Sequence, residues 1–568
     1  MSHLRFPHIH SRFHDLLDDI VVAFRRKSRI LMVVDQSVAV LATAGFGIGR
    51  VIDIMSNASF GCASFDVKLA ARFGSQDKNN AAGLHDFTYT GFRFDQTEAD
   101  GSFIIDHYDQ IWCFGFDPGN DQPNNLDPAI DVNIASHPWA ATNSELERLA
   151  RWMNERQGGL FGTGDHHYLG ASLCSRIPRL GVMRMWSVTD GVPTIGGTTR
   201  LDTNRPVSAA QQAGTAVIPN SVETDAKPQV IDWVAEYTWS TSPFFAYKSP
   251  HPILCHPTLG PINVMPDHPH EGRCFDPTDA NWIATRRDAT YNFNGYSGDQ
   301  FPTVGGVRPL PKIIAWGDTL AGPPLQFAKG EQQARRFPMI SVYDGQKIGI
   351  GRVVTDSTWH HWFNMNLDGL ATEADTTEYE KIKRYYVNIG IWLASATWRK
   401  AMVWCPILTS RFEYFGLKER TLDMSLIDIG RMHIEYLWPR LGPCWVRDWI
   451  WEGLFEIDRD ILKWLEEKIK PRPWPCLTCP PIELIEAAVM GGIIKSLFAD
   501  ERELNKRLSL VDKPRFELDP KEVEQRVRQG TVRGVLELAE LYERSAKEAK
   551  SQIESLTRLI GKERSKGK

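Results

Sequence analysis

The sequence has few cysteines, and their spacing argues against both a disulfide scaffold and a structural zinc site. Nine cysteines in 568 residues are too sparse for a small disulfide-rich secreted fold, and a core of this size needs no such cross-links. We therefore expect reduced thiols. Cys476 and Cys479 form a CxxC pair, but no second pair follows at zinc-ribbon spacing, so a proline-rich turn is favoured over a metal site.

The chain also lacks a long uninterrupted hydrophobic run. Its most apolar stretch, residues 482–498, contains Glu483, Glu486 and Lys495, which favours a core helix over a membrane span of about 20 residues. The amino-terminal region shows no charged segment followed by an apolar one and a small-residue cleavage site. These features predict a cytoplasmic protein without a membrane partner.

No strong charge of either sign is present, and no nucleotide-binding fingerprint is found. A formal net charge of −5 gives no general reason to expect binding to nucleic acid. Gly45, Gly47 and Gly49 miss the GxGxxG spacing of dinucleotide-binding loops, so an ordinary loop entering a helix is expected. We therefore predict neither a nucleic-acid partner nor a nucleotide cofactor.

Strand and helix patterns alternate in the first part of the chain. Residues 29–35 and 108–115 are short apolar runs typical of parallel strands buried on both faces. Thr142 and Glu145 form a potential capping box at the start of an amphipathic helix, and Leu160 begins the next strand. This alternation predicts an α/β fold with a doubly wound, mostly parallel sheet, whose ligand crevice lies at the carboxyl ends of the strands.

The pattern divides the chain into four parts. A polar lead-in of residues 1–27 precedes an α/β domain over 28–375, which carries a weakly periodic insertion at about 187–250. A tryptophan-rich helical region over 376–510 follows, and residues 511–568 include a carboxyl-terminal amphipathic helix.

That helix is expected at about 531–561 and carries an apolar seam with steps of three and four residues. Such spacing is typical of a coiled coil. Alanine and tyrosine weaken the seam, so self-association into a homo-oligomer and packing on the chain's own body remain open alternatives. The seam consists of Val532, Val535, Ala539, Tyr542, Ala546, Ala549, Ile553, Leu556 and Ile560.

Three short histidine-rich and acidic segments are the candidates for chemistry: residues 162–167, 267–271 and 356–361. In the first, a glycine-flanked turn places Asp165 or His166 where hydrolases of the elbow type hold a nucleophile. No serine or cysteine stands there. Elbow-type nucleophilic catalysis is therefore disfavoured.

The second segment contains a potential metal pair. His268 and His270 are two residues apart, so an extended backbone would send both imidazoles to the same face. With His166 they form a candidate set of ligands for a divalent metal, and Glu271 is a candidate general base. An HxH pattern is common without metal, so the alternative of an ordinary loop is kept.

The third segment follows an expected antiparallel hairpin of residues 339–343 and 352–356. In this segment we predict that Asp356 orients His360 as a general base, between the apolar surfaces of Trp359 and Trp362. The alternative is that His360 and His361 are only packed between tryptophans.

The order of several segments resembles the class I glutamine-amidotransferase-like superfamily, and most closely its ThuA-like branch. The resemblance covers about residues 28–370. It implies an amidotransferase-like sheet in which His360 corresponds to the histidine after a late strand, and in which the elbow cysteine is absent. ThuA-like proteins are associated with sugar metabolism. The segments that carry the resemblance are residues 108–111, 158–162, 251–253, the region around Asp267, and 349–353 leading to His360.

These patterns lead to one main functional hypothesis and one alternative. The main hypothesis is an intracellular hydrolase, not a cysteine-dependent glutaminase, that acts on a small polar, sugar- or amide-like molecule. In one version a divalent metal activates water; in the other, His360 is the base and no metal takes part. The alternative is a non-catalytic ligand-binding or assembly module. The predicted pocket comprises Asp165, His166, His268, His270, Glu271, Asp356 and His360.

Overall fold

The computed structural model describes residues 26–60, 62–74, 87–115, 139–164, 170–186, 228–242, 245–266, 273–319, 335–372, 376–413, 424–457, 482–497 and 520–566. The chain divides into two compact units. The sheet unit contains the described residues within 26–236 and 250–399, and the helical unit contains those within 237–249 and 400–568. Within the described part of the chain, no helix is both long and apolar enough to cross a membrane.

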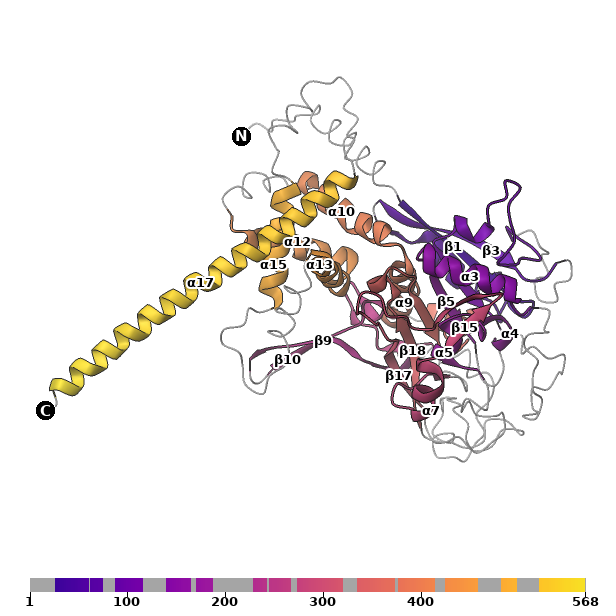
Figure 1. Ribbon diagram of the computed structural model, residues 1–568, viewed down its shortest axis with the longest axis horizontal. Coiled ribbons are helices and arrows are strands. Elements are labelled where there is room, and N and C mark those ends of the chain that lie inside the picture. Colours follow the sequence, from indigo (N-terminus) through magenta and orange to yellow (C-terminus); the bar gives the residue numbers. More distant parts are fainter. Residues whose placement is uncertain are drawn as a thin grey trace, which may run out of the picture. The chain divides into compact units, whose positions relative to one another are not determined.

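A nine-stranded sheet organises the sheet unit, in the order β2-β3-β1-β4-β5-β19-β18-β17-β8. Figure 1 labels its strands β1, β3, β5, β17 and β18. The neighbouring strands β3, β1, β4, β5 and β19 run parallel, whereas β2 at one edge and β18, β17 and β8 at the other are antiparallel to their neighbours. The predicted α/β class is confirmed. The strands are β1 (Arg26–Val34), β2 (Ser59–Phe60), β3 (Ala63–Ala71), β4 (Gln110–Phe114), β5 (Gly159–Thr163), β8 (Asp232–Trp233), β17 (Lys312–Thr319), β18 (Arg335–Tyr343) and β19 (Val353–Asp356).

Helices cover both faces of the parallel strands, which explains why those strands are apolar on both sides. Two residues on opposite faces of β5 show the two layers: a Cβ on Gly162 would lie 2.5 Å from the Leu180 side chain of α5, and one on Gly159 would lie 2.3 Å from Leu393 O of α9. The helices of this unit are α2 (Gly49–Asn57), α3 (Asn143–Glu155), α4 (Ala171–Cys174), α5 (Leu180–Met183), α7 (Ala280–Trp282), α8 (Asn364–Ala371) and α9 (Thr377–Leu393).

Several local predictions are confirmed. Thr142 caps α3 by accepting from Glu145 N, and the Glu145 carboxylate accepts from Thr142 N, which completes the capping box. Strands β18 and β19 pair in antiparallel fashion, with Ile340 opposite Asp356. Five described cysteines are free thiols, but Cys62 is disulfide-bonded, which corrects the expectation that the thiols are all reduced.

The sequence-based boundaries differ from the observed units in two places. Of the predicted insertion over 187–250, residues 187–227 lie outside the described residues, and the remainder contains strands, one of which, β8, joins the sheet edge. The sheet unit continues to Arg399, so α9 belongs to it. The shorter elements are β6 (Arg184–Met185), β7 (Gln229–Val230), β9 (Ala235–Ser242), β10 (Phe245–Pro250), β11 (Cys255–His256), β12 (Gly260–Pro261), β13 (Val264–Met265), β14 (Arg273–Cys274), β15 (Thr290–Phe293), β16 (Tyr296–Asp299), η2 (Ile104–His107), η6 (Pro252–Leu254), η7 (Ile283–Arg287) and η8 (Gly345–Ile348).

The helical unit is held together by close backbone contacts at glycines. A Cβ on Gly430 would lie 1.7 Å from Ala487 O, and one on Gly491 would lie 1.7 Å from Leu426 O, so α12 and α15 pack backbone against backbone. Gly492 and Gly530 make a similar contact between α15 and α17. Its helices are α10 (Ala396–Glu413, which begins in the sheet unit), α12 (Leu426–Leu441), α13 (Pro443–Ile457), α15 (Ile482–Leu497) and α17 (Pro520–Lys566).

Candidate functional site

The candidate site lies where the parallel strands end. The strand order reverses between β1 and β4, because β3 lies on one side of β1 while β4, β5 and β19 follow on the other. In open α/β sheets the ligand crevice forms at such a reversal, outside the carboxyl ends of the strands. Asp35 follows β1 and is fully buried, and Gly115 follows β4. A Cβ on Gly115 would lie only 3.4 Å from Asp35 Oδ2.

The segment after β5 returns to this edge through a glycine. Gly170 has a φ of 85°, and a Cβ there would lie 2.5 Å from Gly115 O and 2.9 Å from Gly164 Cα. Only glycine tolerates both the left-handed backbone and this approach. Gly170 is therefore packed closely against the ends of β4 and β5.

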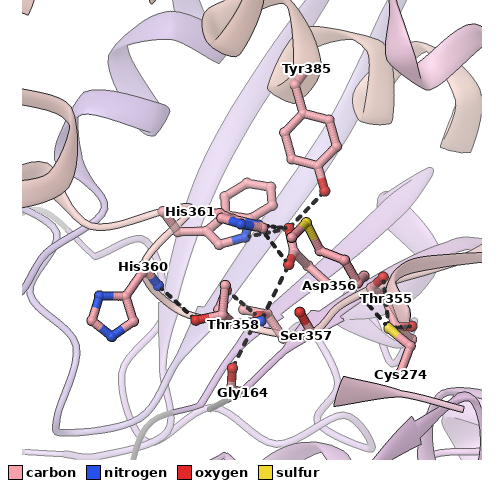
Figure 2. Close-up of polar contacts among 12 residues, drawn as sticks. Gly164, Cys274, Thr355, Asp356, Ser357, Thr358, His360, His361 and Tyr385 are labelled. Carbon is pink, nitrogen blue, oxygen red and sulfur yellow. Dashed lines mark hydrogen bonds and ion pairs between the residues drawn. The ribbon is translucent and has the colours of Figure 1, made fainter. Parts of the chain in front are cut away.

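Asp356, the last residue of β19, is the centre of a buried hydrogen-bond network (Figure 2). His361 Nδ1 lies 2.9 Å from both carboxylate oxygens, and Tyr385 donates its hydroxyl proton to Oδ2 over 2.7 Å. Trp362 Nε1 donates to Oδ2 over 3.2 Å, and Thr358 N lies 3.3 Å from Oδ1. Because the carboxylate accepts, His361 carries its proton on Nδ1 in this arrangement.

The loop after β19 is attached to the neighbouring strand ends. Thr163 at the end of β5 donates its hydroxyl proton to Thr358 O over 3.0 Å. Trp359 Nε1 donates to Gly115 O at the end of β4 over 2.9 Å. These two bonds attach Thr358 and Trp359 to the ends of β5 and β4. The Asp356 network therefore lies at the sheet edge where Asp35 lies.

Arginine and tyrosine side chains set the electrostatics of the site. Arg184 is fully buried and donates to the backbone oxygens of Asp356 and Ser357, which places its guanidinium at the carboxyl end of β19. Burial, together with the negative charge of Asp356, raises the pKa of Tyr385 well above its usual value. Tyr385 therefore stays protonated and remains a donor to Asp356.

The network leaves one imidazole nitrogen without a partner. His361 is fully buried, and its Nε2 has no hydrogen-bond partner within the described residues. The hydroxyl of Ser357 is likewise buried without a partner there. Buried polar groups in folded proteins are nearly always paired, so such atoms at a strand-end site indicate a place for a bound polar group or water.

The carboxylate pairs with His361, which corrects the prediction from the sequence that His360 has this role. Figure 2 shows the His360 ring directed away from Asp356, while the His361 ring is directed at it. The physical reason is the turn over residues 359–362, in which Trp362 N donates to Trp359 O. This turn brings the fifth residue after Asp356, not the fourth, back to the carboxylate.

The other predicted site residues lie outside the described residues: Asp165, His166, His268, His270 and Glu271. Their meeting with Asp356 therefore stays a prediction. Within the described ranges, no group of three or more histidine, cysteine, aspartate or glutamate side chains is arranged to hold a metal ion.

Sequence reasoning missed three residues of this edge: Asp35, Arg184 and Tyr385. For Asp35 a signal was present, since an aspartate directly after the first buried strand stands at the strand end. Arg184 and Tyr385 had no signal, because their neighbours in sequence belong to an apolar segment and an ordinary amphipathic helix.

Comparisons of the chain with protein-family models, with curated proteins and with solved structures found no match. The function must therefore be argued from the geometry of this site.

Proposed function

We propose that the protein is a hydrolase of small polar, sugar- or amide-like molecules in which His361, oriented by Asp356, acts as the general base. The observation that supports this is the pairing of His361 Nδ1 with a buried carboxylate while Nε2 has no partner among the described residues. A carboxylate that holds the proton on Nδ1 leaves the Nε2 lone pair available to accept a proton.

In the proposed reaction, His361 Nε2 takes a proton from water as the water oxygen attacks the electrophilic carbon of the substrate. The bond to the leaving group then breaks, and the imidazolium returns the proton to that group. Asp356 stabilises the imidazolium by charge, and Tyr385 and Trp362 keep the carboxylate in place through their hydrogen bonds to Oδ2.

Asp35 supports a polar substrate. Its carboxylate lies beside Gly115 at the reversal of strand order, where α/β sheets bind their ligands. A carboxylate accepts hydrogen bonds from hydroxyl or amide donors, which sugars and amides supply. Because Gly115 has no side chain, Leu173 and Gly170 pack against this strand end beside the Asp35 carboxylate.

The version with a metal remains part of the proposal. His166, His268 and His270 would hold a divalent cation whose bound water becomes acidic, and Glu271 or Asp356 would take its proton. The resemblance to ThuA-like proteins is likewise a proposal, and it favours sugar derivatives as the first substrates to screen. Metal analysis of the purified protein, with His268→Ala and His270→Ala as comparisons, tests the metal version: a stoichiometric metal that both variants lose would support it.

The test of the base is a hydrolysis screen on amides, esters and sugar derivatives, followed by variants assayed on the best substrate. We expect His361→Gln and Asp356→Asn to lower kcat/KM by about 10²-fold or more, the usual contribution of a positioned base. His360→Gln is the matched control, because its ring is directed away from Asp356, and it should change kcat/KM far less. Full activity in a folded His361→Gln protein would contradict the proposal.

The second candidate function is a non-catalytic ligand-binding module. The complete burial of both Asp356 and His361 favours it, because an enclosed pair with four donors to the carboxylate is also a stable structural unit. This candidate predicts no hydrolysis of any tested substrate, a large loss of stability in His361→Gln, and ligand binding that depends on Asp35.

A further inference from the structure

Within the described part of the chain, the distal part of α17 has no partner element. The first turns of the helix pack on α15 through Gly530 and Gly534. Beyond Tyr542 every residue up to Arg558 is exposed, and Figure 1 shows α17 extending alone past α12, α13 and α15. Ile553 and Leu556, 64% and 58% exposed, lie three residues apart on one face. Apolar residues at this spacing normally lie against another helix.

We propose that this segment pairs with the same segment of a second copy of the chain, in antiparallel orientation and in one defined register. The proposal is independent of the hydrolase proposal. In this register Leu556 lies opposite a small residue, and the aromatic Tyr542 lies opposite an aliphatic residue. The opposed pairs are Ala539 with Leu556, Tyr542 with Ile553, and Ala546 with Ala549, each occurring twice by symmetry.

Charge selects this register over its neighbours. Glu543 and Lys550 flank the seam on the same side, and in the proposed register Glu543 of one copy faces Lys550 of the other, twice. Shifting by one heptad in one direction places Glu543 opposite itself, and shifting in the other direction places Lys550 opposite itself. Both shifts bring like charges together, which is unfavourable.

Orientation is selected by the same residues. A parallel pair in register places each seam residue opposite its own copy, so Ala539, Ala546 and Ala549 would each form a small layer. The flanking contacts would then join Lys550 to Ser545 and Thr557 to Gln552, with no pair of opposite charges. The antiparallel arrangement places Leu556 opposite Ala539 in each copy, leaves Ala546 opposite Ala549, and adds two ion pairs.

The first test uses the full chain and measures its mass in solution as a function of concentration. Wild type should form a dimer, and Lys550→Glu should weaken it about tenfold, because two attractive contacts become repulsive. The double variant Glu543→Lys with Lys550→Glu should restore wild-type affinity. Arg544→Glu is the matched control: it changes charge equally, but its position faces away from the seam. A monomeric wild type, or a double variant no better than Lys550→Glu, would overturn the proposal.

The second test distinguishes orientation. Ala546→Cys and Ala549→Cys proteins are prepared separately, mixed and oxidised, with wild type treated in parallel as the background. An antiparallel dimer predicts cross-linking in the mixture and little in either variant alone. Efficient self-linking of Ala546→Cys would show a parallel pair and refute the stated geometry. Circular dichroism of each variant confirms that the helix is retained.

Discussion

The sheet unit and the helical unit are stabilised in different ways. The sheet unit contains fully buried polar groups that are satisfied inside the protein: Arg72 pairs with Glu145 and also donates to Ala140 O, and Arg184 donates to the ends of β19. Both units contain glycines at close contacts, but in the helical unit these contacts join whole helices to each other, α12 to α15 and α15 to α17. Among its described residues, Arg447 and Glu486 also form a buried ion pair.

This difference bears on where chemistry can occur. Hydrogen bonds and ion pairs are directional, so a unit rich in buried polar networks holds side chains at fixed positions, as an active site requires. Contacts between glycine backbones depend on shape alone. The sheet unit is therefore the place where a site can be built, and the helical unit is suited to presenting a helix.

The largest effect is expected on breaking the Arg72–Glu145 pair of the sheet unit. Arg72→Ala leaves the Glu145 carboxylate buried without its cation, which should cost about 3–5 kcal/mol of unfolding free energy. The Glu145 carboxylate also accepts from Thr142 N at the start of α3 and from Phe94 N, so the damage should appear as lost hydrogen-exchange protection in α3 and at Phe94.

Arg151→Ala is the control for this experiment, since Arg151 pairs with Glu147 and Glu155 on the exposed surface of the same helix. It should cost less than about 1 kcal/mol. A similar loss of unfolding free energy in Arg72→Ala and Arg151→Ala would show that the buried pair contributes no more stability than the exposed pairs.

A smaller effect is expected at the glycine contacts of the helical unit. Gly491→Ala forces a Cβ against Leu426 O, and relief by separating α12 from α15 should cost about 1–3 kcal/mol. Gly453→Ala in α13 is matched to it, because no atom lies within 4 Å of the added Cβ, and it should stabilise by about 0.5–1 kcal/mol. The stability of each variant is measured by hydrogen exchange in α15. Equal and small changes in Gly491→Ala and Gly453→Ala would contradict the inference that α12 and α15 are closely packed.

The smallest effect is expected on the stability of the sheet unit at acidic pH. Burial, and then the charge of Arg384, lowers the pKa of His256 to about 4. The folded state therefore holds this imidazole neutral, and stability should fall as pH decreases from the unfolded-state pKa near 6.5. The loss levels off below about 4, and the partial exposure of the ring limits it to less than about 1 kcal/mol.

His256→Asn tests this reasoning by removing the titration while keeping an acceptor for Thr258 N and Leu259 N. Urea midpoints measured between pH 7 and pH 4 should fall less steeply for the variant than for wild type. Parallel curves would exclude His256 as a source of the acid sensitivity.

The sequence predicted the fold correctly where interactions between residues close in sequence determine the structure. The apolar run ending at Asp35, the capping box of Thr142 and Glu145, and the hairpin leading to Asp356 each have short-range signals, and each is observed. The helix predicted from about residue 531 begins earlier, at Pro520, because its first turns are fixed by packing on α15 rather than by the seam.

The site was readable only in part. Asp356 was identified because it ends a strand, but the choice between His360 and His361 depends on a single turn that sequence patterns do not determine. Tyr385 reaches the carboxylate from α9, and Arg184 reaches the backbone oxygen of Asp356 from a distant segment, so their roles arise from tertiary contacts alone. Asp165, His166, His268, His270 and Glu271 stay predictions.

The place of β19 in the sheet has a consequence for how the chain is made. Thr163 on β5 bonds to Thr358, 195 positions later, so the ribosome must complete most of the polypeptide before β5 gains its second neighbour. Until then the nascent chain exposes an unpaired strand edge that invites aggregation. Efficient production should thus depend on factors that shield emerging chains, and fragments ending before β19 should be insoluble.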